Sequence, residues 1–290
     1  LVARVQVVTD STADLPAELA SALRISVVPC QLLWGEETYR DGVDIPPPEF
    51  FRRMATSREL PRTSQPPVSA FLQVYERLLN GEGAEAVVSV HVAGSLSGTL
   101  NAAWAASQCL ATPGRVAVVD SGQVSMGLGW AAVEAARMAA NGAGLAEVAR
   151  ATQELGPRLK TAAMIDSLDN LRKGGRINQF SALLGTALQI KPLVSLDSGE
   201  VSIWARVRSR SKALLALVER VRSWGPLAEV AVLHAGAEDV AQTLVARLQD
   251  LFAERELRIL PAGSALTSHL GLGAVGLCAL VAGDPVRPME

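Results

Sequence analysis

The chain has 290 residues, of which 49% are hydrophobic and 19% charged, and its net charge at pH 7 is −2. This length suffices for about two domains, and the near-neutral charge argues against nucleic-acid binding, which needs a clustered basic surface. Three cysteines and three histidines are scattered without metal-ligand spacing, so neither a disulfide framework nor a metal site is expected. No apolar run reaches the ~20 residues of a membrane span. The N-terminus lacks the charged region and cleavage site of a signal peptide, so a cytoplasmic protein is expected.

Strands and helices alternate in the first half of the chain. Short apolar runs predict strands, and longer periodic runs that follow caps or prolines predict helices. The expected strands are 5–8, 25–33, 87–92 and 115–119, and the expected helices are 16–23, 46–54, 69–79, 100–110, 128–140 and 145–155. The polar segment 38–44 and the proline-rich segment 60–68 are expected to be irregular. This alternation is typical of a parallel sheet with helices on its faces.

The pattern changes after Gly156 and Pro157. The expected strands are then 161–165, 191–196, 200–204, 229–234 and 257–260, with helices at 168–177, 181–188, 211–221 and 237–252 and a loop at 261–273. Asp197-Ser198-Gly199 lies between two strands and is typical of a hairpin turn, so antiparallel pairing is expected. We therefore predict an α/β protein of two domains. Residues 1–157 carry a mainly parallel sheet, and residues 158–290 form an α+β domain with an antiparallel sheet.

Small hydroxyl residues follow the apolar strand in segment 87–99, VVSVHVAGSLSGT. A strand that ends in serines and glycines and then enters a helix directs backbone N–H groups and hydroxyls at one spot, which predicts an anion site. Asp10-Ser11 and Asp120-Ser121 follow two further strands in the same way. Either these residues only cap helices, or three polar turns gather along the edge where parallel sheets bind ligands.

Two enzyme classes can be tested by motif. The chain lacks the GxxxxGK[ST] pattern of a Walker-type NTPase. The segment 93–97, AGSLS, is only distantly similar to the GxSxG turn of hydrolases. A serine acyl hydrolase that uses Ser95 or Ser97, with Asp197 and either His234 or His269, has a suitable chain order and is the alternative enzyme hypothesis.

Five motifs carry a resemblance to a known family. They are VTDSTADL at 8–15, TSQP at 63–66, LSGT at 96–99, VDS at 119–121 followed by SMGLG at 125–129, and LRKGGRI at 171–177. The chain resembles the DegV family over residues 5–283, in the family's order. These are bacterial fatty-acid-binding proteins that serve as the acyl-binding (B) subunit of fatty acid kinase.

The resemblance implies two α/β domains with a long-chain fatty acid between them in an apolar tunnel. It implies that hydroxyls of the TSQP loop and the SGT turn hold the carboxylate, which here match Thr63, Ser64 and Ser97, with Ser95 as a further candidate. Basic residues near the head group map onto Arg176, Arg208 and His269. A separate kinase subunit would phosphorylate the carboxylate from ATP for phospholipid synthesis. The chain itself would be no enzyme and need no cofactor, and transient proximity to a membrane would be compatible with this role.

Each of these residues also has an ordinary structural interpretation. Ser97 is suited to a helix N-cap, Arg176 to the end of a helix, and Arg208 to a solvated basic face. The chain also departs from the family pattern, with Ser95 where glycine is common and without the proline usual near His269. A third hypothesis, a regulatory module for another anionic metabolite, predicts a polar cavity instead of an apolar one.

Overall fold

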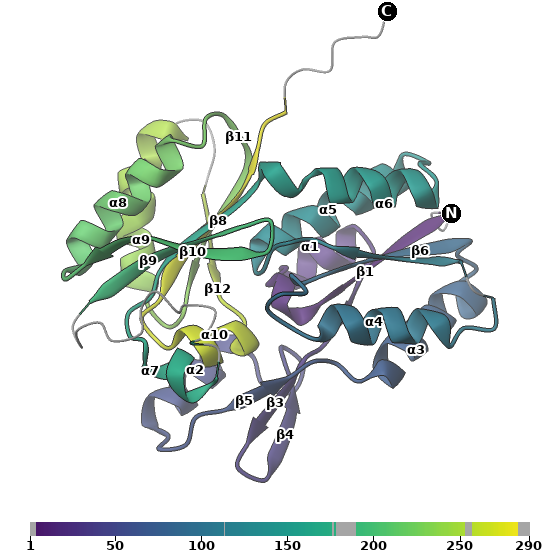
Figure 1. Ribbon diagram of the computed structural model, residues 1–290, viewed down its shortest axis with the longest axis horizontal. Helices are drawn as coiled ribbons and strands as arrows, with labels where there is room; N and C mark the ends of the chain where they lie inside the picture. Colours follow the sequence, from purple (N-terminus) through teal and green to yellow (C-terminus); the bar gives the residue numbers. More distant parts are fainter. Residues whose placement is uncertain (1–3, 113, 176, 178–189, 253–256, 284–290) are drawn as a thin grey trace, which may run out of the picture.

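Three β-sheets form the framework of the part of the chain that the structure describes (Figure 1). The computed structural model describes residues 4–112, 114–175, 177, 190–252 and 257–283, so the helix expected at 181–188 lies outside the described residues. A parallel sheet has the order β2 (Ile25–Val28), β1 (Val5–Asp10), β6 (Ala86–His91), β7 (Val116–Asp120). A larger sheet has the order β10 (Glu200–Val207), β9 (Lys191–Asp197), β8 (Leu159–Met164), β13 (Val275–Val281), β11 (Leu227–His234), β12 (Arg258–Pro261). A small sheet has the order β4 (Glu37–Arg40), β3 (Gln31–Trp34), β5 (Arg62–Ser64).

Helices cover both faces of the parallel sheet. Its two central strands are buried along their whole length, as expected of valine-rich strands between two helical layers. One face packs against α3 (Val68–Glu76) and α4 (Thr99–Gln108). The other packs against α1 (Ala17–Ala22), α5 (Met126–Ala140) and α6 (Leu145–Glu154). All three strand pairs are parallel, which confirms the expected fold of the first half.

The larger sheet is antiparallel except for the pair β11–β12. Helices α8 (Arg210–Arg222) and α9 (Glu238–Leu248) cover one of its faces. The opposite face is turned towards α5 and the cavity described below. A parallel sheet beside an antiparallel one confirms the predicted fold class.

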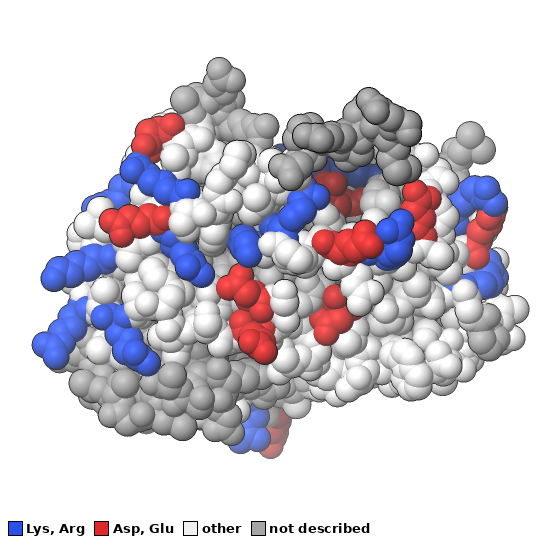
Figure 2. Space-filling model, turned by 45° about the horizontal axis from the view of Figure 1, so that its top comes forward, with Lys and Arg blue, Asp and Glu red and all other residues white. Residues whose placement is uncertain are grey.

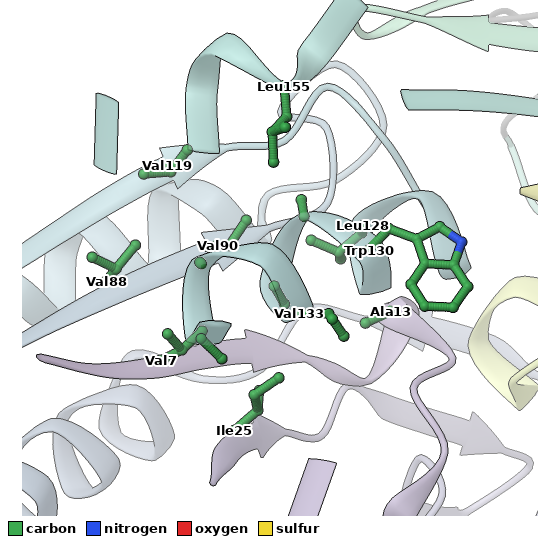
Figure 3. Close-up of a cluster of buried hydrophobic side chains, with 14 of the residues drawn as sticks. Val7, Ala13, Ile25, Val88, Val90, Val119, Leu128, Trp130, Val133 and Leu155 are labelled. Carbon is green, nitrogen blue, oxygen red and sulfur yellow. The ribbon is translucent and has the colours of Figure 1, made fainter. Parts of the chain in front are cut away.

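Helix α5 joins the two larger sheets through one apolar cluster (Figure 3). The cluster contains Val7 and Val88 of the parallel sheet together with Leu233 and Cys278 of the larger sheet. Trp130 on α5 points towards β13, where its indole N–H donates to the backbone oxygen of Cys278 at 3.4 Å. This cluster contains residues from both sides of the domain boundary expected between residues 157 and 158. That boundary stays a prediction.

Glycines allow α5 to approach its neighbours closely. A Cβ added to Gly127 would lie 2.7 Å from the Thr161 hydroxyl, and one added to Gly129 would lie 2.9 Å from the Ala13 carbonyl. Such distances are shorter than real Cβ contacts, so glycine lets the first turn of the helix pack against strand β8 and the turn after β1.

The remaining elements pack beside the two larger sheets. These are α2 (Pro47–Thr56), the small sheet, α7 (Asp169–Lys173) and α10 (Ser264–Leu270). Leu32 and Trp34 of β3 pack with Phe50 of α2 and Ala265 of α10 in one apolar cluster. Arg53 stacks over the rings of Trp34 and Tyr39 with its guanidinium carbon 4.4 and 5.2 Å from the ring centres.

Four expected elements are wrong. The strand predicted at 25–33 is divided by Pro29, because proline lacks the N–H that a continuing ladder needs. The loop predicted at 38–44 contains β4, which pairs with β3. The proline-rich loop at 60–68 contains the short edge strand β5, which pairs with the other side of β3. The loop predicted at 261–273 contains helix α10, which tertiary contacts stabilise.

Candidate functional site

A cavity of about 180 Å³ lies between the two larger sheets and is far larger than the voids of a close-packed interior. Its walls come from the turns after β1 and β6, from β5, from helices α7 and α10 and from the larger sheet. Most of the lining side chains are apolar, and those from the larger sheet include Ala163, Val194, Leu196, Leu233, Val275 and Leu277. The hypothesis of a polar metabolite predicted a polar cavity, which does not match this lining.

Thr63 and His269 meet at the wall of this cavity. The Thr63 hydroxyl lies 2.7 Å from Nε2 of His269, although the two residues are 206 positions apart in sequence. Strand β5 carries Thr63, and the last turn of α10 carries His269. The loop after α7 packs behind the imidazole, because a Cβ on Gly174 would lie 3.0 Å from its Nδ1.

Ser97 lines the same cavity and also supports the start of α4. Its hydroxyl accepts from the Thr99 N–H at 3.2 Å and lies 2.9 Å from the Thr99 hydroxyl. The neighbouring Gly98 packs against Gln65, because a Cβ at that position would lie 3.4 Å from the Gln65 amide. The TSQP loop and the SGT turn are therefore adjacent, and Ser64 and Gln65 also line the cavity.

The other predicted site residues lie elsewhere. Ser95 donates to the backbone oxygen of Gly199, in the β9–β10 turn, and is not among the lining residues. Arg208 is exposed between β10 and α8, also outside the lining. Basic side chains gather on the side of the molecule where Figure 1 places α8 (Figure 2). Arg176 lies outside the described residues. The roles assigned to all these residues, and to those at the cavity, stay predictions.

The polar turns that follow β1, β6 and β7 do gather along one edge of the parallel sheet. The Asp10 carboxylate accepts from the N–H of Val92, after β6, at 3.2 Å. The Asp120 carboxylate, at the end of β7, accepts from the N–H of Gly94 at 3.1 Å. The capping interpretation also holds for Asp10, which accepts from the N–H of Thr12 at 3.1 Å.

A Ser-His-Asp arrangement exists behind this edge, in residues that the hydrolase hypothesis did not name. The Ser89 hydroxyl lies 2.7 Å from Nε2 of His91, and Nδ1 of His91 lies 2.9 Å from the Asp10 carboxylate. All three residues are completely buried, and Tyr75 closes the chain with a hydrogen bond of 2.8 Å to Ser89. A nucleophile without access to substrate cannot attack an ester, so these three residues are not a catalytic site. The serines that the hydrolase hypothesis named bond elsewhere, Ser97 to Thr99 and Ser95 to the backbone oxygen of Gly199, so that hypothesis is not favoured.

Sequence reasoning missed several side chains at this edge. Asp14 and Ser125 hold positive φ angles of 49° and 57°, which are uncommon for residues other than glycine. The Ser125 hydroxyl donates to the Asp14 carboxylate at 2.6 Å, and Ser125 and Thr12 both line the cavity. Burial raises the pKa of Asp14 to about 7, helped by the nearby charge of Asp41. Both Asp14 and Ser125 stand within motifs of the family resemblance, but nothing in those motifs indicates their backbone conformations.

Within the described ranges, no helix is long and apolar enough to cross a membrane. The same residues hold no cluster of three or more His, Cys, Asp or Glu side chains that is suited to a metal ion.

Comparisons with known proteins identify the family. The family model described as "Uncharacterised protein, DegV family" matches residues 4–282. Protein DegV of Bacillus subtilis is 32% identical over 278 residues, which cover 94% of this chain and 98% of that protein. A DegV domain-containing protein of Mycobacterium tuberculosis is 38% identical over 287 residues, which cover 97% and 99% of the two chains.

Solved structures give the same result. A DegV family protein from Thermus thermophilus, described by its fatty-acid binding, is 33% identical with a TM-score of 0.86, and the match covers 96% of this chain and all of that one. DegV of Bacillus subtilis, described as a fatty acid binding protein, is 30% identical with a TM-score of 0.86, and the match covers 96% of this chain and 99% of that one. The resemblance found in the sequence motifs is confirmed, and the chain belongs to the DegV family.

Proposed function

We propose that this chain binds one long-chain fatty acid in the cavity between its larger sheets and presents the carboxylate to a separate kinase subunit. The observation that best supports the proposal is an apolar cavity at whose wall three distant segments bring together hydroxyls and an imidazole, with Thr63 and His269 in direct contact. Relatives whose solved structures are described as fatty-acid-binding proteins share the fold over nearly the whole chain.

The polar side chains suit a carboxylate. A carboxylate taken out of water needs hydrogen-bond donors, or its desolvation is costly. The hydroxyls of Thr63, Ser64 and Ser97 stand at the wall, and Ser95, two residues before Ser97, is kept as a further candidate donor. When the Thr63 hydroxyl donates to the carboxylate, the Thr63 oxygen can accept from Nε2–H of His269. This second bond strengthens the Thr63 hydroxyl as a donor.

The apolar walls suit the acyl chain. About fifteen methylene groups at ~0.8 kcal/mol each contribute on the order of 12 kcal/mol before the costs of binding are subtracted. The chain of the ligand therefore supplies most of the affinity, and the polar wall selects the acid. A ligand held in this way should stay bound during purification.

The kinase subunit performs the chemical step. A carboxylate oxygen attacks the γ-phosphorus of ATP, the bond from that phosphorus to the bridging oxygen of ADP breaks, and an acyl phosphate and ADP result. The new phosphate carries more negative charge than the acid, and the guanidinium groups of Arg208 and Arg176 are suited to bind it. The chain itself holds and presents the acid without a cofactor. We place this exchange in the cytoplasm, with the product passing to phospholipid synthesis at the membrane.

The binding step is tested by native mass spectrometry of the purified protein, followed by identification of the extracted lipid. We expect one long-chain fatty acid per chain. A protein that is free of lipid, and that does not take up oleate or palmitate when they are added, would contradict the proposal.

The presentation step is tested with Arg208→Ala in an assay that contains ATP and the kinase subunit of a bacterial fatty acid kinase. We expect unchanged fatty-acid content and at least about tenfold slower acyl phosphate formation, because Arg208 is exposed outside the cavity lining. Arg222→Ala is the matched control, since Arg222 is an exposed arginine at the other end of α8 and pairs with Asp250 at 2.5 Å. Equal loss of lipid and of phosphorylation in Arg208→Ala would show that its assigned role is wrong.

A further inference from the structure

The helix that carries His269 is held at its beginning by two aspartates from the first part of the chain. The Gly263 N–H donates to the Asp14 carboxylate at 2.9 Å, and the Ser264 N–H donates to the Asp41 carboxylate at 3.2 Å. The first N–H groups of a helix have no partner within the helix, and a seven-residue helix is unstable on its own in water. Both carboxylates therefore stabilise α10 where it begins.

Each of these carboxylates is also tied to the turn region at the edge of the parallel sheet. The second oxygen of Asp14 accepts from the Ser125 hydroxyl at 2.6 Å, and the second oxygen of Asp41 accepts from the Ser11 hydroxyl at 2.8 Å. The Ser125 N–H in turn donates to the Thr12 carbonyl at 2.7 Å. The two aspartates thus connect α10 to the turn after β1 and to the start of α5.

Gly263 provides an independent sign of this close attachment. A Cβ at this position would lie 2.5 Å from the Asp14 carboxylate oxygen that accepts from its N–H, which is closer than real Cβ contacts. Its next neighbours are more than 3.5 Å away, so the constraint comes from Asp14. A glycine is therefore required here for the carboxylate to reach the helix.

The other end of α10 forms part of the cavity wall. His269 follows Ser264 by five residues, and its Nε2 lies 2.7 Å from the Thr63 hydroxyl. A short helix is rigid over this length, so a shift at its first turn moves the imidazole relative to Thr63. The buried Ser268 hydroxyl donates to the Ser264 carbonyl at 2.8 Å, which links the two ends further.

We propose that Asp14 and Asp41 are positioning residues: by holding the first turn of α10 they fix the His269 imidazole against Thr63 and thereby set how long the head group of the ligand stays bound. The effect on ligand residence time rests on the proposed function, whereas the position of His269 is a property of the protein alone. Asp14, and Ser11 as the partner of Asp41, give the motif at residues 8–15 a role that head-group binding leaves unexplained.

The test measures the imidazole and the ligand separately in the full chain. Long-range ¹H–¹⁵N NMR reports the His269 ring, and a His269→Gln spectrum assigns its signals among the three histidines of the chain. Dissociation of a fluorescent fatty acid reports the head group. In Gly263→Ala and in Asp41→Ala we expect shifted Nε2 resonances of His269. We also expect about tenfold faster dissociation, because each change weakens the attachment of a carboxylate to the first turn of α10. Asp41→Asn keeps an acceptor oxygen for Ser264 and should restore most of both readouts.

Two further variants separate positioning from general damage. Asp250→Ala is the matched control, because Asp250 is exposed, pairs with Arg222 at 2.5 Å on the surface and should change neither readout. Glycine tolerates the positive φ of residue 14, and Asp14→Gly removes the carboxylate that a Cβ at position 263 would meet. The double variant Asp14→Gly with Gly263→Ala should therefore shift the His269 resonances no more than Asp14→Gly alone. Unchanged His269 resonances in folded Gly263→Ala and Asp41→Ala would overturn the inference. Absence of bound fatty acid in the wild type would overturn the proposed function. The NMR measurement would still test whether the two aspartates position His269.

Discussion

Two hydrogen-bonded sets of polar side chains, each with a histidine and a hydroxyl, lie near the same edge of the parallel sheet. One set is buried in the protein interior, and the other lies at the wall of the cavity. In the first set, Tyr75, Ser89, His91 and Asp10 form a closed chain of hydrogen bonds with no exposed surface. In the second, Thr63 and His269 are joined by one hydrogen bond of 2.7 Å at the wall of an apolar cavity. The first set resembles a catalytic triad more closely, yet only the second can meet a ligand.

The difference shows that access, more than residue type, decides what such side chains do. Every polar atom removed from the buried set takes a hydrogen bond from a neighbour in a dry interior, which costs stability. The cavity set faces space that a ligand can fill, so its hydrogen-bonding capacity is available for binding. We therefore expect changes in the buried set to lower stability and changes in the cavity set to lower ligand retention.

The largest effect is expected from His91→Ala. It leaves the Asp10 carboxylate and the Ser89 hydroxyl without their shared partner in the interior, and loss of such a buried network costs roughly 3 kcal/mol or more. Urea unfolding followed by circular dichroism measures this change. Thr63→Ala, the corresponding change at the cavity, should lower the free energy of unfolding by less than about 1 kcal/mol. If both variants lose equal stability, the distinction between the two sets is wrong.

Sequence reasoning recovered the parallel sheet, the gathering of polar turns along its edge and the two cavity segments with Thr63 and Ser97. It succeeded where local pattern and fold agree, as in the valine strands followed by Asp-Ser and Ser-Gly turns. It failed at α10 and β5, because a seven-residue helix and a three-residue strand among prolines depend on distant contacts. Asp14 and Asp41 at α10, and β3 beside β5, supply those contacts.

The buried set of Tyr75, Ser89, His91 and Asp10 was not predicted from the sequence for a related reason. Asp10 and His91 are 81 residues apart, and nothing in the local pattern of either strand indicates that their side chains meet. His91 is the last residue of its strand and is completely buried, as befits a structural histidine.

The next largest effect concerns Asp14, whose titration should make the free energy of unfolding depend on pH. Its folded-state pKa of about 7 lies above the ordinary value of 3.8, because of burial and the charges of Asp41 and Asp10, against the opposing hydrogen bonds from Ser125 and Gly263. The folded protein thus holds this proton more tightly than the unfolded chain. The resulting stabilisation is complete below about pH 4 and is lost as the pH rises through about 7.

Asp14→Asn tests this dependence, because asparagine tolerates the positive φ, keeps an acceptor for the Gly263 N–H and does not titrate. Between pH 4 and pH 8 the wild type should lose about 2 kcal/mol more stability than the variant, a value reduced for the partial exposure of the Asp14 side chain. Thermal or urea unfolding across this range measures it. Parallel stability curves for the two proteins would show that Asp14 does not titrate in this range.

The smallest effect on stability, and the clearest on function, is expected from Thr63→Ala combined with Ser97→Ala. Loss of these hydroxyls removes donors to the carboxylate, and fatty-acid dissociation should become at least about tenfold faster, or about 1.4 kcal/mol. Mass spectrometry of the purified variant should show less bound lipid. Thr56→Ala with Ser223→Ala is the matched control, because both hydroxyls are exposed and donate to carbonyls of the helix that each residue ends. Unchanged lipid content in the Thr63 and Ser97 variant would remove both residues from the head-group site, and the cavity would then hold its ligand through the apolar wall alone.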